Sequence, residues 1–217
     1  MKYRIGDVEK MSDEEILLHM DESPLFPYEY GRRLQYVYHD IVKAFEYYKK
    51  AAESDFYFAT WAIARMLEEE ELHLTDEEKA YWYKRAADKN DLFSMWKLAH
   101  CYRDGRGVKQ NIEEYIRLIT YLTEQGYCSV ALELADLYER GEYVEQSYEK
   151  AFKIYGDFAF GENSSLEARY KYAYYLLHGI GCTKNRESAK EHFLYLARYH
   201  HSLAIEILRN EFHIEIS

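Results

Sequence analysis

The sequence has little proline, few cysteines and no long apolar run. Two prolines among 217 residues, where about 5% is usual, indicate few interrupted elements and a mostly helical chain. Three cysteines, an odd number, fit reduced thiols rather than a disulfide framework. No apolar stretch approaches the roughly 18 residues that cross a bilayer, and the N-terminal stretch turns acidic where a secretion signal would be apolar. We therefore expect a cytoplasmic protein.

Basic charge is also scarce. The chain carries 28 Lys and Arg against 39 Asp and Glu, a formal net charge of −11. This balance argues against nucleic-acid binding, which needs concentrated basic residues, and favours a basic protein as partner. Apolar residues at 48% and charged residues at 31% describe a globular chain, of a length that suits one domain or two small ones.

One segment recurs along the chain. KAFEYYKKAAE, at residues 43–53, returns as EKAYWYKRAAD at 78–88, and more weakly from residues 114, 150 and 188. A pair of small residues within it, Ala51 and Ala52, recurs in steps of 35, 36, 36 and 38 residues. A good helix N-cap residue precedes each copy at the same steps: Asp40, Thr75, Asn111, Ser147 and Asn185. Two independent markers with one drifting period predict a repeat of about 36 residues.

A second helical pattern lies between these segments. Apolar residues three and four positions apart predict a helix, which closes on a turn such as DGRGV at 104–108 or HGIGC at 178–182. Glycine at such a position indicates a left-handed helix stop. The repeat is therefore a helix, a tight turn and a second helix. Stacked copies predict an all-α solenoid of antiparallel helix hairpins.

These residues resemble the Sel-one-like repeats, close relatives of the tetratricopeptide repeats. The resemblance covers roughly residues 40–204 and is clearest in Gly105-Arg106-Gly107-Val108 and in Lys50-Ala51-Ala52. It implies a right-handed superhelix and a role as a protein-binding adaptor or inhibitor. Alanine stands where the family has a small glycine in the first helix, at Ala64, Ala99, Ala135 and Ala173.

Three regions follow from this resemblance. We expect a partly irregular N-terminal cap over 1–38, repeats over 39–203, and a closing helix and tail over 204–217. Glu68 to Glu71 stand where one Gly-x-Gly turn is missing, so we expect an extended helix or an irregular loop there.

No pattern indicates catalysis, a cofactor or a metal. Gly105 and Gly107 follow no strand and lack the third glycine of a nucleotide-binding loop. His192 and His200 lie about two helical turns apart, too far to share one metal. His100 and Cys101 are adjacent in a helix and point about 100° apart, so a thiolate–imidazole pair is not expected.

The candidate site is a surface. In stacked hairpins the first helices line the concave face, and their third, seventh and tenth positions face the groove. These positions hold Trp61, Arg65, Glu68, Trp96, His100, Arg103, Leu132, Asp136, Glu139, Tyr170, Tyr174 and Leu177. Aromatic residues and Arg are enriched among interface hot spots.

The alternative for two of these residues is a place in the core. Trp61 and Trp96 could pack beneath neighbouring helices, as we expect for Trp82 and for most of the 24 tyrosines, whose hydroxyls would reach water.

The predicted function is a non-catalytic adaptor or inhibitor that binds a basic protein in its groove. One form of it is a bacterial immunity protein that neutralises a toxic effector. The alternatives are a signalling scaffold or regulatory adaptor and, more remotely, a hydrolase with a site between repeats. We expect a monomer or weak homo-oligomer that binds neither nucleic acid nor membrane.

Overall fold

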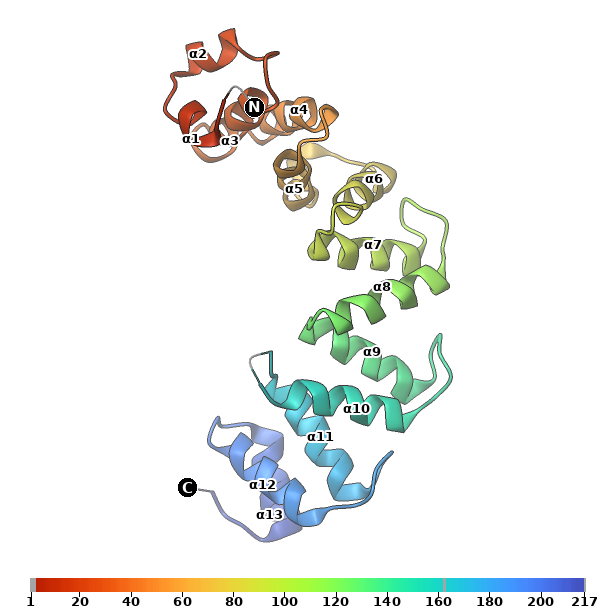
Figure 1. Cartoon of the computed structure of the whole chain (residues 1–217). Helices are drawn as coiled ribbons and strands as arrows, with labels where there is room; N and C mark the ends of the chain where they lie inside the picture. The colour runs from red at the N-terminus through yellow and green to blue at the C-terminus, as the bar shows by residue number, and fades with distance from the viewer. Residues whose placement is uncertain (1–2, 162, 217) are drawn as a thin grey trace. The chain divides into compact units, whose positions relative to one another are not determined.

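The computed structural model describes residues 3–161 and 163–216, and every regular element in them is helical (Figure 1). The prediction of an all-α fold built from helix hairpins is confirmed. None of the helices in this part of the chain has the length and apolarity of a membrane-crossing segment. The elements are α1 Ile5–Val8, α2 Asp13–Leu18, α3 Leu25–Tyr36, α4 Ile41–Glu53, α5 Tyr57–Met66, the 3₁₀ helix η1 Glu70–Leu72, α6 Asp76–Ala87, α7 Leu92–Asp104, α8 Ile112–Glu124, α9 Cys128–Arg140, α10 Tyr148–Ala159, α11 Leu166–His178, α12 Arg186–Ala197 and α13 Ser202–Phe212.

The second helix of each repeat begins where the cap residues predict. Helices α4, α6, α8, α10 and α12 start one residue after the five predicted N-cap positions. Asp40, Thr75, Ser147 and Asn185 each accept a hydrogen bond from the backbone N–H three residues on, at 3.0–3.3 Å. Such bonds satisfy donors that the first turn of a helix leaves free.

The glycines of the Gly-x-Gly turns have two different tasks. Gly105 and Gly179 end α7 and α11 in the left-handed conformation, as predicted, at φ +69° and +73°. The second glycine, Gly107, lies against the start of α6, where an added Cβ would stand 1.9 Å from the carbonyl oxygen of Asp76. The tight turn therefore needs the first glycine for its backbone angle and the second for close approach as well.

Small residues allow the helices to pack closely. Ala64, Ala99, Ala135 and Ala173 are each at most 1% exposed, which places the four alanines of the first helices in the core. Trp82 is 7% exposed and confirms its predicted place in the core.

Two compact units divide the chain. We call Met1–Asn111 the N-terminal unit and Ile112–Ser217 the C-terminal unit. Each unit has core clusters of its own.

The segment expected as a cap contains a regular helix. α3 packs against α4 as the first helix of a hairpin, although its first turn contains Pro27. Proline is tolerated there because the first turn has no use for its N–H. Of the two alternatives expected for the acidic run 68–71, an extended helix or an irregular loop, the structure has the loop. α5 ends at Met66, and the loop that follows contains η1.

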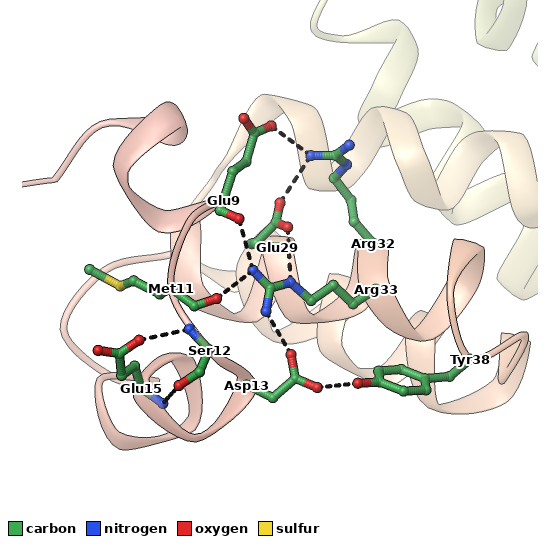
Figure 2. Close-up of polar contacts among 9 residues, drawn as sticks. All are labelled: Glu9, Met11, Ser12, Asp13, Glu15, Glu29, Arg32, Arg33 and Tyr38. Atoms are coloured by element: carbon green, nitrogen blue, oxygen red, sulfur yellow. Dashed lines mark hydrogen bonds and ion pairs between the residues drawn. The ribbon is translucent and has the colours of Figure 1, made fainter.

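Arg33 fastens the short helices α1 and α2 to α3. Its guanidinium donates to Asp13 at 2.7 Å, to Glu29 at 3.2 Å, and to the carbonyl oxygens of Glu9 and Met11 at 3.1 and 2.8 Å (Figure 2). Glu29 is only 7% exposed, so the ion pair is largely shielded from water. The hydrogen bond from Tyr38 and that from Arg33 lower the pKa of Asp13.

Candidate protein-binding face

In the N-terminal unit, Arg65 of α5 lies between two aromatic rings. Its guanidinium carbon is 5.1 Å from the ring centre of Trp61 and 4.1 Å from that of Phe93. Trp61 is 39% exposed, so it belongs to the surface and not to the core. Cations placed over aromatic faces in this way are attracted by the ring quadrupole.

Asp91 fixes this arginine. The two terminal nitrogens of Arg65 donate to the two carboxylate oxygens of Asp91 at 3.1 and 3.0 Å. Asp91 is 6% exposed and also caps α7, accepting from the backbone N–H of Ser94 at 2.9 Å and from its hydroxyl at 2.5 Å. A paired, largely buried carboxylate therefore holds a partly exposed arginine in one orientation.

The aromatic contacts continue along α7. The ring of Phe93 is 6.0 Å from that of Trp96, which meets His100 edge to face at 5.2 Å. The ammonium of Lys97 lies 5.3 Å from the Trp96 ring. Trp96 is half-buried, so it is less exposed than the pattern predicts.

A pocket of about 300 Å³ adjoins this surface, and Glu68, Trp96, His100 and Arg103 are among its lining residues. Arg103 donates to Asp104 at 2.7 and 3.2 Å and is half-buried. The six predicted residues of the N-terminal unit therefore lie on α5, α7 and the loop after α5, with Glu68, Trp96, His100 and Arg103 gathered around one pocket.

Glu68 is tied to its surroundings. It accepts hydrogen bonds from the hydroxyl of Tyr83 at 2.7 Å and from Lys97 and Lys79 at 3.0 and 3.4 Å. The bond from Tyr83, together with the two ammonium groups, lowers the pKa of Glu68 to about 2. Glu68 thus joins the loop after α5 to α6 and α7.

In the C-terminal unit, Asp136 and Glu139 connect neighbouring helices in a similar way. Glu139 accepts from Lys171 at 3.2 Å and from the hydroxyl of Tyr175, both on α11. Asp136 accepts from Tyr155 of α10 at 3.1 Å and from Arg140 at 3.3 Å. Both carboxylates therefore hold neighbouring helices together.

The remaining predicted residues lie on α11. Tyr174 is 37% exposed, whereas Tyr170 is half-buried and stacks on His201 at 5.0 Å. Leu177, expected to face the groove, is 1% exposed, and that expectation is wrong. It belongs to a core cluster with Phe193 of α12 and Leu208 of α13, because the closing helix completes the core around this end of α11.

Sequence reasoning missed two residues that shape the surface of the N-terminal unit. Phe93 supplies the second ring over Arg65, and Asp91 supplies its carboxylate. The signal for the capping role of Asp91 was available, since aspartate is a preferred N-cap residue and directly precedes the apolar pattern of α7. Nothing in the sequence pairs Asp91 with an arginine 26 residues earlier.

The part of the chain that the structure describes has no evident metal site, and its cysteines are poorly suited to act as nucleophiles. No group of three or more His, Cys, Asp or Glu side chains within 3–161 and 163–216 could hold a metal ion. All three cysteines are half-buried free thiols. Burial raises the pKa of Cys101, which disfavours the reactive thiolate form.

A family model identifies the class of protein. The Sel1 repeat model matches residues 26–56, 74–91, 92–114, 129–156 and 166–201, which together exceed half of the chain. The chain belongs to the Sel1 repeat family, whose members are generally protein-interaction modules. The first match starts at residue 26 and includes α3 except for its first residue. No curated protein matches the chain with significance.

Two solved structures show the same fold. One is c5321, a protective antigen of uropathogenic Escherichia coli strains with an SLR fold, at 21% identity and a TM-score of 0.74. The match covers 96% of this chain and 46% of the antigen, so this chain spans about half the antigen's length. The other is a Sel1 repeat protein from Oxalobacter formigenes, at 19% identity and a TM-score of 0.68, covering 84% of this chain and 74% of that one.

Proposed function

We propose that this chain is a non-catalytic adaptor or inhibitor that binds a basic protein on the first-helix face formed by α5 and α7. The observation that carries the proposal is Arg65, held by Asp91 between Trp61 and Phe93. Side chains that are already ordered lose little conformational entropy when a partner binds. Tryptophan and arginine are also the residue types most often found to anchor an interface.

The charge of the molecule supports the choice of a basic partner. The net charge is −11, and Glu69, Glu70 and Glu71 are exposed beside the pocket residue Glu68. Acidic groups near an interface attract a basic partner and speed its approach. Within this class we favour an immunity protein that acts in the cytoplasm and neutralises a basic effector.

The test is to isolate the partner by affinity capture with mass spectrometry and then to measure its binding to variants. Trp61→Ala and Trp96→Ala should each weaken binding by about 2 kcal/mol or more, as for aromatic anchors elsewhere, with the helical circular dichroism unchanged. Tyr121→Ala is the control, because Tyr121 is an exposed aromatic residue on α8, a second helix. Unchanged affinity after loss of both tryptophans would place the site elsewhere.

A further inference from the structure

A second groove lies between α4 and α6, the second helices of two successive repeats. Phe45 and Trp82 form its floor, with ring centres 6.4 Å apart, and they are 4% and 7% exposed. Tyr81, which is 56% exposed, stands beside Trp82 with its ring centre 5.2 Å away. The groove has a volume of about 460 Å³, enough to admit side chains of a partner.

The chain's own cations already use these rings. The guanidinium of Arg85 lies 5.0 Å from the ring centre of Trp82 and 5.9 Å from that of Tyr81, and it donates to the carbonyl oxygen of Ala52 at 2.9 Å. The ammonium of Lys49 lies 5.4 Å from the ring centre of Phe45 and pairs with Glu46 at 3.2 Å. Both cations are therefore engaged, and neither is needed to balance the carboxylates at the rim.

Two of those carboxylates have no partner in the described part of the chain. Glu53 ends α4 and Glu77 lies in the first turn of α6; both line the groove and are exposed. Neither forms a hydrogen bond or ion pair through its side chain with any residue of 3–161 or 163–216. The groove therefore combines aromatic rings at its base with two unpaired carboxylates at its rim.

We propose that this groove binds an arginine side chain from an extended segment of a basic protein. A second guanidinium can lie over the exposed ring of Tyr81, whose centre Arg85 approaches only to 5.9 Å, while its N–H groups donate to Glu53 or Glu77. This combination suits arginine better than lysine. The net charge of −11 draws such a segment towards the molecule. This surface lies on the second helices and is separate from the first-helix face proposed above.

The tryptophan indole N–H groups provide the test. Trp82 floors this groove, whereas Trp61 and Trp96 belong to the first-helix face, so the three nitrogen-15 NMR signals report separately on the two surfaces. The probe is a nonapeptide of alternating arginine and glycine, and its control carries citrulline, which is uncharged, in place of arginine. We expect the arginine peptide to shift the Trp82 signal and the citrulline peptide to leave it unchanged.

Charge variants complete the experiment. The double variant Glu53→Gln with Glu77→Gln should raise the dissociation constant up to about fivefold, since the exposed ion pair is lost whichever of the two carboxylates forms it, and the remaining affinity should depend less on salt. Glu124→Gln with Glu142→Gln removes the same charge from exposed positions in the C-terminal unit and should have little effect.

Three results would overturn the proposal: equal binding of the citrulline peptide, equal weakening by the two double variants, or shifts of Trp61 and Trp96 without a shift of Trp82. The last result would support the first-helix face while rejecting this groove, so the two proposals can fail separately.

Discussion

At the scale of single residues, three of the five second helices place a buried tyrosine at the same position. Tyr48, Tyr83 and Tyr155 each lie eight residues after the N-cap residue of their helix and are at most 2% exposed. Their hydroxyls were expected to reach water, but they donate to Gln35, Glu68 and Asp136, at 2.9, 2.7 and 3.1 Å. A hydroxyl withdrawn from water needs such an acceptor, because leaving it unpaired would cost free energy.

Replacing Glu68 by Gln should lower the free energy of unfolding by about 1 kcal/mol at pH 7. The side chain is 55% exposed, so solvent screening keeps the effect small. The pKa of Glu68 falls from 4.5 to about 2 on folding, so its stabilisation is present above about pH 4.5 and is lost as the pH falls towards 2. Urea unfolding followed by circular dichroism should show the gap between the two proteins closing over that range.

Glu69→Gln is the matched control. Glu69 is the next residue, is exposed, and its carboxylate has no partner among the residues that the structure describes. Its replacement removes a charge without breaking a contact and should leave the free energy of unfolding at pH 7 unchanged. A gap at pH 7 that persists undiminished to pH 2 would show that Glu68 acts through something other than its charge.

At the scale of elements, the hairpins depend on close contact between one turn and the start of the neighbouring helix. Gly181 repeats the arrangement of Gly107, since an added Cβ would lie 2.3 Å from the carbonyl carbon of Tyr148 at the start of α10. The turn after α9 is different, because Tyr143 takes the second position with φ +61° and places its ring edge to face on Tyr115 at 6.0 Å. One hairpin thus replaces a glycine contact with an aromatic one.

Gly107→Ala should lower the free energy of unfolding by about 3 kcal/mol, since backbone strain adds to a clash with the backbone of α6. Gly161→Ala is the control. Gly161 also has a positive φ, +88°, but an added Cβ there would meet nothing within 4 Å. We therefore expect a loss of about 1 kcal/mol for Gly161→Ala. Thermal unfolding measures both, and equal losses would mean that φ alone accounts for the effect.

The elements that local chemistry defines could be predicted from the sequence. Asp40 and Thr75 start helices through their own hydrogen bonds, and Gly105 stops one through its backbone angle. α3 was not predicted, because Pro24 at its N-cap position has no side chain that can cap the helix and because Pro27 lies in its first turn. Cap residues and proline positions do not reveal this helix, because its stability comes from packing against α4.

In the candidate site too, some features could be predicted from the sequence and others could not. The helical period placed Trp61 and Tyr174 on the surface, since it depends only on the residue's own helix. It could not show that Asp91 reaches Arg65, or that α13 brings Leu208 into the core around Leu177, because both depend on contacts with another helix.

At the scale of the whole molecule, buried tyrosines occur in both units. Desolvation by burial, followed for Tyr83 and Tyr175 by the hydrogen bond to a glutamate, raises the pKa of Tyr48, Tyr83, Tyr155 and Tyr175. Because the folded-state pKa lies above the unfolded value, this stabilisation is complete below about pH 10 and is lost as the pH rises further.

Alkaline titration should therefore show two groups among the 24 tyrosines. Tyrosine side chains in water ionise near pH 10, while the four buried ones should ionise later and together with the loss of helical circular dichroism. The absorbance of tyrosinate measures the first process. In concentrated guanidinium chloride all the tyrosines should titrate in one step near pH 10, and a single step in the native protein would contradict the burial.

The tyrosine bonds also bear on how the chain folds during synthesis. Tyr48 reaches back 13 residues to Gln35, Tyr83 reaches 15 to Glu68, and Tyr175 reaches 36 to Glu139. In each of these pairs the acceptor leaves the ribosome before the tyrosine that needs it. The bonds of Tyr48 and Tyr83 close within 15 residues, so little chain entropy is lost in forming them, whereas that of Tyr175 spans a whole repeat. A newly made hairpin can therefore satisfy its buried hydroxyl without waiting for the next repeat to be translated.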